Sequence, residues 1–225
     1  MDGAAPLARF AAEEIGWPGS PVLRDVSLSL RTGERVVILG RSGAGKSTLL
    51  GAIRRRLEEA GQTVALVPQE HGLVPQLSVH HNVYMGRLDA HGTLYNLANL
   101  LWPFARERAR TAPWIDTVGL SGLERRAVET LSGGQRQRTA LARALFRGGE
   151  VLLADEPVSA VDPAQGAGLL DALGARFPTL VLALHDRDAA LRVATRIIGL
   201  REGRVMLDAA PDALGPDDLA MLYAA

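Results

Sequence analysis

A dense run of glycine, lysine and hydroxyl residues occupies positions 40–48, which read Gly-Arg-Ser-Gly-Ala-Gly-Lys-Ser-Thr. The run fits G-x-x-x-x-G-K-[ST], the pattern of a phosphate-binding loop. Its glycines permit backbone conformations that a Cβ obstructs, so the loop can curl and point its N–H groups at phosphate oxygens. Lys46 is expected to reach the β- and γ-phosphates of a nucleotide, and the Ser47 hydroxyl to ligate Mg²⁺. The residues expected to contact the nucleotide are Gly40, Arg41, Ser42, Gly43, Ala44, Gly45, Lys46, Ser47 and Thr48.

Two apolar runs are expected to position this chemistry. Residues 36–39 predict a short buried strand, and residues 46–60 predict a helix whose N-terminus adds partial positive charge behind the phosphates. Residues 151–154 predict a second buried strand, which ends in Asp155 and Glu156 at the edge where ligands bind in open α/β sheets. Asp155 is expected to hold Mg²⁺ and Glu156 to act as a general base toward water. Taken alone, the pair also fits a strand that ends in two solvated acids.

A Leu-Ser-Gly-Gly-Gln pentapeptide occupies positions 131–135. Serine is a favourable helix N-cap, so these residues can simply begin the helix predicted at 135–146. A helix N-terminus that carries bare glycines also suits a phosphate group, because its N–H groups and dipole face an anion. Both interpretations can hold together.

With these motifs in this order, the chain resembles the nucleotide-binding subunits of ATP-binding cassette (ABC) transporters over roughly residues 15–207. The resemblance implies an α/β fold: a RecA-like P-loop NTPase core with a mostly parallel sheet, an antiparallel sheet ahead of it and an inserted α-helical subdomain. It implies one nucleotide-binding domain over 1–225, with its core at about 1–67 and 148–225 and its helical subdomain at about 68–147. Only 23 positions separate Lys46 from Gln69 (69 − 46), fewer than is typical of the family, so we expect a shortened antiparallel sheet.

The resemblance also implies roles for single residues. Trp17 matches the aromatic residue that stacks on adenine, and Gln69 matches the glutamine that contacts Mg²⁺ and responds to the γ-phosphate. His185 matches the switch histidine, which stabilises the transferring phosphoryl group. The pentapeptide matches the family signature, which closes over ATP bound to a second copy of the chain. The residues expected at that shared site are Ser132, Gly133, Gly134, Gln135 and Asp162.

Other interpretations of these residues stay open on the sequence. Trp17 lies in a turn-like Trp-Pro-Gly segment and can be a core or turn aromatic, Gln69 can be a solvated loop residue, and His185 can be a buried, satisfied histidine. The remaining histidines lack the regular spacing of a metal site. The arginine clusters at 54–56 and 106–110 are interpreted as solvated helix faces.

Composition restricts the class of protein further. Basic and acidic residues both number 25, so no net charge favours nucleic acid as a partner. Cysteine is absent, which excludes disulfides and suits the cytosol. No run reaches the roughly 18 apolar residues of a membrane span, and the first residues lack the basic region of a signal peptide. If the protein works at a membrane, we expect other subunits to provide the spans.

The function implied by the resemblance is ATP binding and hydrolysis, with Mg²⁺, in a subunit of an ABC importer. ATPases of phosphonate importers are similar to this chain at residues 40–45, 82–83, 86–88, 94–104 and 153–157. This resemblance implies phosphonate or a related oxyanion such as phosphite. The implied partners are a second copy of the chain, an integral membrane permease and a periplasmic or lipid-anchored solute-binding protein. The implied location is the cytoplasmic face of the membrane, as a peripheral subunit.

The apolar loop at 73–77 is a candidate dock for a permease helix, or an ordinary core segment. Three alternatives remain for the function. One is an importer ATPase for a different solute. Another is a soluble ABC ATPase of DNA repair or translation, although the long insertions or second cassette of that class are missing. The third is a regulator without turnover, against which Glu156 and His185 argue.

Overall fold

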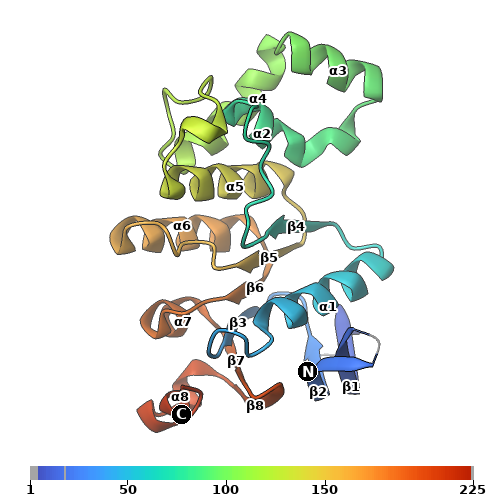
Figure 1. Cartoon of the computed structure of the whole chain (residues 1–225), viewed down its shortest axis with the longest axis vertical. Coiled ribbons are helices and arrows are strands. Elements are labelled where there is room, and N and C mark those ends of the chain that lie inside the picture. Colours follow the sequence, from blue (N-terminus) through green and yellow to red (C-terminus); the bar gives the residue numbers. More distant parts are fainter. Residues whose placement is uncertain (1–4, 18, 224–225) are drawn as a thin grey trace. The chain divides into compact units, whose positions relative to one another are not determined.

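The computed structural model describes residues 5–17 and 19–223, which form two compact units (Figure 1). The first unit contains the described residues up to Leu66, then Gly149–Pro157, then those from Phe177 onward. The second unit contains Val67–Gly148 and Val158–Arg176. Each unit is therefore assembled from segments that are distant in sequence.

The first unit is built on two sheets. Strands β1 (Ala8–Trp17) and β2 (Ser20–Leu30) form a two-stranded antiparallel sheet. The larger, six-stranded sheet has the order β4, β5, β6, β3, β7, β8. Its strands are β3 (Arg35–Leu39), β4 (Val64–Val67), β5 (Val151–Asp155), β6 (Thr179–Ala183), β7 (Arg196–Arg201) and β8 (Arg204–Ala209). Strands β5, β6, β3 and β7 run parallel to one another, and β8 pairs antiparallel with β7.

The apolar character of the parallel strands follows from their burial on both faces. Val37 and Ile38 of β3 and the residues of β5 before Asp155 are completely buried, which confirms the strands predicted at 36–39 and 151–154. Helix α1 (Lys46–Glu59) belongs to the same core and confirms the helix predicted at 46–60. Leu49, Ile53 and Leu57 recur every four residues along α1, so they share one face and bury it.

Short helices complete the first unit. Helix α7 (Arg187–Val193) begins after Asp186, whose carboxylate accepts hydrogen bonds from the N–H groups of Asp188 and Ala189. After β8 the described chain continues in η3 (Pro211–Ala213) and α8 (Pro216–Ala220). Across the described parts of both units, we find no helix with the length and apolar character needed to traverse a bilayer.

The second unit is helical. It contains α2 (Val79–Tyr84), η1 (Met85–Ala90), α3 (Thr93–Leu101), α4 (Ala105–Thr117), η2 (Val128–Thr130), α5 (Gly133–Arg147) and α6 (Pro163–Arg176). Helices α2, α4 and α5 pack against one another. Helix α5 confirms the helix predicted at 135–146 but begins two residues earlier. Helices α3 and α6 are not among the helices predicted from the sequence.

One arginine on α4 does not fit the predicted solvated face. Arg106 and Arg108 are exposed, whereas Arg110 is half-buried and its guanidinium lies 2.9 Å from the carboxylate of Glu107. Glu107 is completely buried. A buried carboxylate needs a charged partner, so Arg110 turns inward.

Candidate functional site

One edge of the large sheet gathers the ends of three parallel strands. In the register, Ala183 of β6 pairs with Ile38 of β3 on one side and with Asp155 of β5 on the other. The phosphate loop follows β3, Glu156 follows β5, and His185 lies two residues beyond Ala183. The sequence therefore brings these three groups to the carboxyl edge of one sheet, which is where open α/β folds bind ligands.

The glycines of the loop meet specific steric demands. The φ angles of Gly40, Gly43 and Gly45 are 151°, 79° and 101°, a region that side chains disfavour. A Cβ at position 40 would lie 2.4 Å from the carbonyl oxygen of Leu200 in β7. Gly45 is the N-cap of α1 and provides no capping side chain, so the first N–H groups of the helix are left for an anion such as phosphate.

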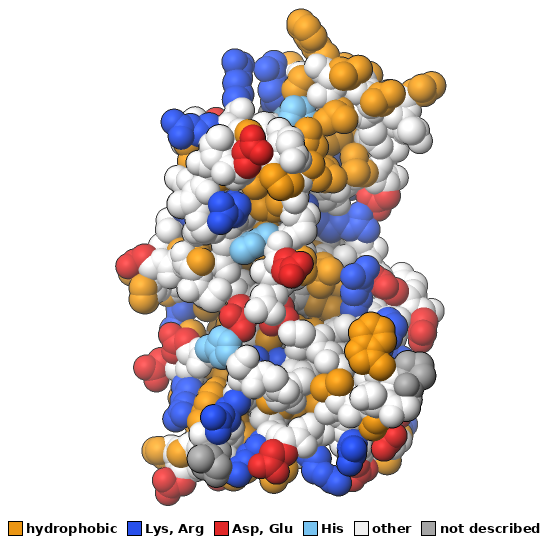
Figure 2. Space-filling model, in the orientation of Figure 1, with side chains coloured by type: hydrophobic (Ala, Val, Ile, Leu, Met, Phe, Trp, Pro, Cys, Tyr) orange, Lys and Arg blue, Asp and Glu red, His pale blue; other side chains and the backbone are white. Residues whose placement is uncertain are grey.

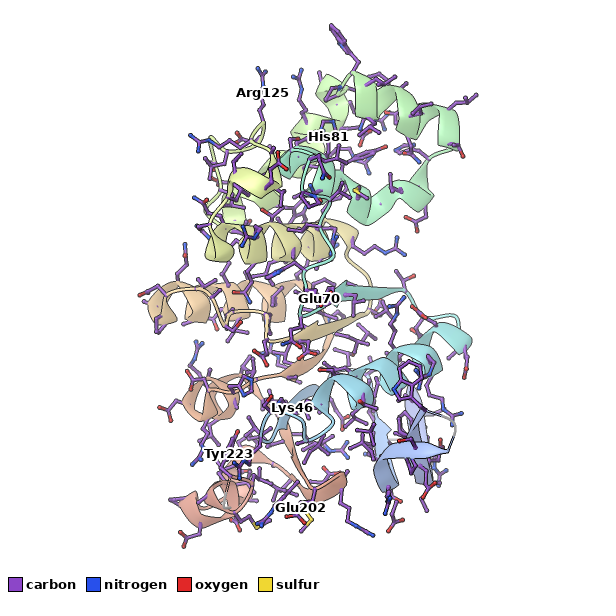
Figure 3. The ribbon with its side chains drawn as sticks, viewed as in Figure 1. Lys46, Glu70, His81, Arg125, Glu202 and Tyr223 are labelled. Atoms are coloured by element: carbon purple, nitrogen blue, oxygen red, sulfur yellow. The ribbon has the colours of Figure 1, made fainter. Side chains whose placement is uncertain are left out.

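Lys46 is held by the loop that it belongs to. Its side chain is buried, and Nζ donates hydrogen bonds to the carbonyl oxygens of Gly40 (2.9 Å) and Arg41 (3.0 Å). Burial lowers the pKa of Lys46, while the nearby carboxylates of Glu156 and Asp155 oppose that shift. Figure 3 labels Lys46 at the start of α1. The cation is thus preformed at the position where β- and γ-phosphates are expected.

Glu156 and His185 form a direct pair. Nε2 of His185 lies 2.5 Å from Oε1 of Glu156, and the backbone N–H of Glu156 donates to the carbonyl oxygen of Ala183 at 3.0 Å. Glu156 has a φ of 52°, in the left-handed region that residues other than glycine rarely adopt. The side chain of His185 is 47% exposed, so it is not a buried core histidine. A carboxylate and an imidazole in contact beside Lys46 can orient water and accept a proton.

Two oxygen donors lie where Mg²⁺ is expected. Ser47 supplies a hydroxyl at the start of α1, and Asp155 supplies a carboxylate at the end of β5. Hard oxygen donors, few in number, suit Mg²⁺, which usually keeps waters and binds the phosphates of its nucleotide. The donor set therefore fits this ion.

Trp17 ends β1, where it pairs with Ser20, and its side chain is 79% exposed. It is therefore not a core aromatic. An exposed indole face is available for stacking, and its contact with adenine stays a prediction. Pro18 of the same turn lies outside the described residues.

The signature residues open α5 in the second unit. Ser132 is the N-cap: its Oγ accepts a hydrogen bond from the N–H of Gln135, and Oε1 of Gln135 accepts from the N–H of Ser132. This reciprocal capping box satisfies two N–H groups at the helix start. A Cβ at Gly133 would meet no atom within 4 Å, whereas one at Gly134 would lie 2.6 Å from the carbonyl oxygen of Ala160. Gly133 is therefore open to a ligand, and Gly134 admits a neighbouring loop.

That loop, residues 159–162, is fixed to α5 by a residue that the sequence did not single out. Gln137 is buried, donates from Nε2 to Oγ of Ser159 (3.2 Å) and accepts at Oε1 from the N–H of Ala160 (2.8 Å). Asp162 accepts hydrogen bonds from the N–H groups of Ala164 and Gln165 and so caps the start of α6. The signature and Asp162 thus belong to one local assembly.

Gln69 is exposed and follows β4 in a turn at the start of the second unit. Beyond it, Arg143 of α5 donates hydrogen bonds to the carbonyl oxygens of His71 (2.5 Å) and Gly72 (2.6 Å). Arg143 is a second positioning residue that sequence reasoning missed. An arginine on a helix face gives no sequence signal of the carbonyl groups it will bind.

The first unit therefore joins the phosphate loop, Asp155, Glu156 and His185, and the second joins the signature, Asp162 and the loop after Gln69.

The ABC transporter family matches residues 23–159 of this chain. The chain is 38% identical, over 98% of its length, to the phosphonates import ATP-binding protein PhnC of Anaeromyxobacter dehalogenans, and it spans about half (49%) of that relative. It is 37% identical to the phosphite import ATP-binding protein PxtA of Stutzerimonas stutzeri, over 93% of the chain and 84% of the relative.

A solved structure also resembles this chain and supports membership of the ABC transporter family. The dimeric ATP-binding cassette MJ0796, in a post-hydrolysis state with ADP and Pi, is 27% identical with a TM-score of 0.70, over 85% of this chain and 91% of the cassette. The likeness confirms the predicted P-loop NTPase fold. The chain belongs to the ABC transporter family, as one of its ATP-binding cassettes.

Proposed function

We propose that this chain binds and hydrolyses ATP with Mg²⁺ and that the turnover drives an importer of phosphonate or a related phosphorus oxyanion. The observation that carries the proposal is the Glu156–His185 contact at the sheet edge that also presents Lys46. Phosphoryl transfer needs positioning and charge stabilisation more than covalent chemistry, and this edge can supply both.

The residues divide the work as follows. The loop N–H groups and Lys46 hold the β- and γ-phosphates, and Ser47 and Asp155 hold Mg²⁺, which neutralises phosphate charge when bound. Glu156 accepts a proton from the attacking water while the oxygen of that water forms a bond to the γ-phosphorus. The bond to the β-phosphate oxygen breaks, and ADP leaves with that oxygen. His185 orients the Glu156 carboxylate and donates to the transferring phosphoryl group.

The signature is proposed to act on ATP bound to a second copy. Ser132, Gly133 and the start of α5 present N–H groups and a hydroxyl without an obstructing side chain at Gly133. These groups suit a γ-phosphate from outside their own unit. Gln69 and Asp162 are proposed to respond to the same phosphate. The dimeric state of the related cassette supports this arrangement.

The permease is proposed to dock beside the loop at 73–77. Asn82, completely buried, accepts from the N–H of Val74 and donates to the carbonyl oxygens of Val74 and Leu77. The loop is therefore held in one shape, as a docking surface requires. The names of the relatives support phosphonate or phosphite as the imported solute. A membrane permease and a separate solute-binding protein are proposed as the other components.

Glu156→Gln tests the catalytic proposal. Loss of a general base should lower ATP turnover by about 10²–10⁴-fold while ATP binding persists, measured by steady-state phosphate release and equilibrium binding. Glu150→Gln is the matched control, because Glu150 lies just before β5, at the opposite end of the same strand. Near-parental turnover in Glu156→Gln would exclude this role.

The solute needs a separate test. A host strain that lacks the chain should fail to grow with a phosphonate or with phosphite as its only phosphorus source, and should grow normally on inorganic phosphate. Restoring the parent chain should rescue growth, and Glu156→Gln should not. Unimpaired growth of the deletion strain on both compounds would assign the importer to another solute.

A further inference from the structure

Helix α3 has its polar and apolar faces reversed relative to an ordinary surface helix. Leu94, Leu97, Ala98 and Leu101 follow the i, i+3, i+4, i+7 spacing of one helix face, and all of them are exposed. A surface helix normally turns such a face toward its own core. Here the apolar face points to solvent, and the polar face packs inward.

The inward face is held by hydrogen bonds that fix this orientation. The hydroxyl of Tyr95 donates to Glu107 at 3.0 Å, and Asn96 accepts from the hydroxyl of Tyr84 at 2.7 Å. Asn99, completely buried, accepts from the N–H of Phe104 at 2.8 Å. Rotating the helix to bury its leucines would break all of these contacts, so the exposure of the leucines is built into the unit.

The outward face exposes large apolar side chains. Leu94 is 84% exposed, Leu101 is 76% exposed, and Trp102 directly after the helix is 79% exposed. Figure 2 shows hydrophobic side chains gathered over the part of the second unit where Figure 1 places α3, with Lys or Arg side chains beside them. A contiguous apolar surface of this kind is unfavourable in water and marks a place of contact.

Cationic side chains border this face. Arg108 and Arg125 line the same hollow as Trp102, with a volume of about 890 Å³, and Arg106 lies four residues beyond Trp102. No acid within the described part of the chain forms an ion pair with these three arginines. One acid, Glu124, also lines the hollow, where its carboxylate accepts from the N–H of Gly122. Figure 3 shows Arg125 projecting away from the second unit.

We propose that this face, defined by Leu94, Leu97, Leu101 and Trp102 with Arg106, Arg108 and Arg125, binds directly to the surface of an anionic phospholipid bilayer. Leucines and a tryptophan next to unpaired arginines match the interfacial region, where apolar side chains enter the acyl boundary and cations meet headgroup phosphates. A second copy of the chain fits less well, because self-pairing would bring the arginines of two copies together. The contact adds to the proposed function and can fail while ATP turnover persists.

Vesicle flotation tests the proposal with the full chain. Vesicles of phosphatidylcholine plus phosphatidylglycerol should carry the protein upward, vesicles of phosphatidylcholine alone should carry much less, and added salt should weaken binding. Leu94→Ser combined with Leu101→Ser should lower partitioning at least tenfold. Arg108→Gln and Arg125→Gln should each lower it about fivefold. The matched control is Met206→Ser with Arg204→Gln, an exposed apolar–basic pair on β8 that should leave binding unchanged.

Tryptophan emission gives a second readout that a folding defect does not imitate. With Trp17 and Trp114 replaced by Phe, the emission of Trp102 should shift to shorter wavelength on addition of anionic vesicles. Far-UV circular dichroism and ATP turnover of the leucine variant should match the parent. Absence of binding to anionic vesicles, or binding that survives the leucine changes, overturns the proposal. Two further results also overturn the proposal. One is a dimer in size exclusion that the leucine changes abolish and the arginine changes do not. The other is binding that requires a membrane protein in the vesicle.

Discussion

Gly133 and Gly134 offer an internal comparison, because adjacent glycines in the same helix turn face different surroundings. A methyl group at Gly133 would meet no atom within 4 Å, whereas one at Gly134 would lie 2.6 Å from the carbonyl oxygen of Ala160. Both positions are helical, so Gly→Ala should bring both variants a similar gain in helix propensity. The difference between the two variants should therefore report the collision with Ala160.

The expected size of that difference follows from the geometry. The carbonyl oxygen must retreat by several tenths of an ångström, and Gln137 holds the same loop through Ser159 and the N–H of Ala160. Overpacking of this kind costs about 1–3 kcal/mol. For a chain of this length, that corresponds to a melting temperature about 2–12 °C lower in Gly134→Ala than in Gly133→Ala.

Differential scanning fluorimetry without nucleotide measures this difference, and hydrogen exchange locates it. The amides of residues 159–162 should exchange faster in Gly134→Ala and at the parental rate in Gly133→Ala. Equal melting temperatures with unchanged exchange in that loop would refute the reasoning, because they would mean that the loop yields at no cost. A loss confined to Gly133→Ala would refute it as well.

Three further outcomes are expected. Ser132→Arg should leave ATP binding by the monomer intact and block ATP-driven dimerisation in size exclusion; equal loss of both would contradict a site shared between two copies. Trp17→Ala should weaken ATP binding by about 1–3 kcal/mol and Trp17→Tyr should be nearly silent, as measured by equilibrium binding, since stacking needs only an aromatic face. Burial lowers the pKa of His80 from 6.5 to about 4, so the unfolded chain takes up a proton before the folded one does. Stability should therefore fall as pH drops from about 6.5 to about 4, and urea midpoints of His80→Gln should lack that part of the decline.

The parts of the site that could be predicted are those whose sequence pattern is contained in a few consecutive residues. The phosphate loop combines its ligands in consecutive residues, and the strand before it and the strand before Asp155 are unbroken apolar runs that only a covered parallel sheet accommodates. Ser132 followed three residues later by Gln135 is a capping box, a signal that spans a single turn. None of these depends on a partner that is distant in sequence.

The parts that could not be predicted depend on distant partners. Gln137 is a polar residue in a helix, and its supporting role depends on hydrogen bonds with residues 159–160, which lie more than twenty positions away in the sequence. The leucines of α3 follow the period of a core-facing stripe, and the opposite orientation is set by Glu107 of α4 and by Phe104 just before that helix. Helix α6 is rich in glycine and alanine, so its periodic signal is weak.

The positive φ of Glu156 has a consequence for the stability of the whole protein. At 52° the residue occupies a region where glycine is at ease and other side chains cost about 1–3 kcal/mol. Glycine at this position would relieve that strain and would also remove the proposed base. Selection for heat resistance alone would thus favour glycine at position 156, whereas selection for ATP turnover would favour the acid. The most stable version of this chain is therefore expected to be an inactive one.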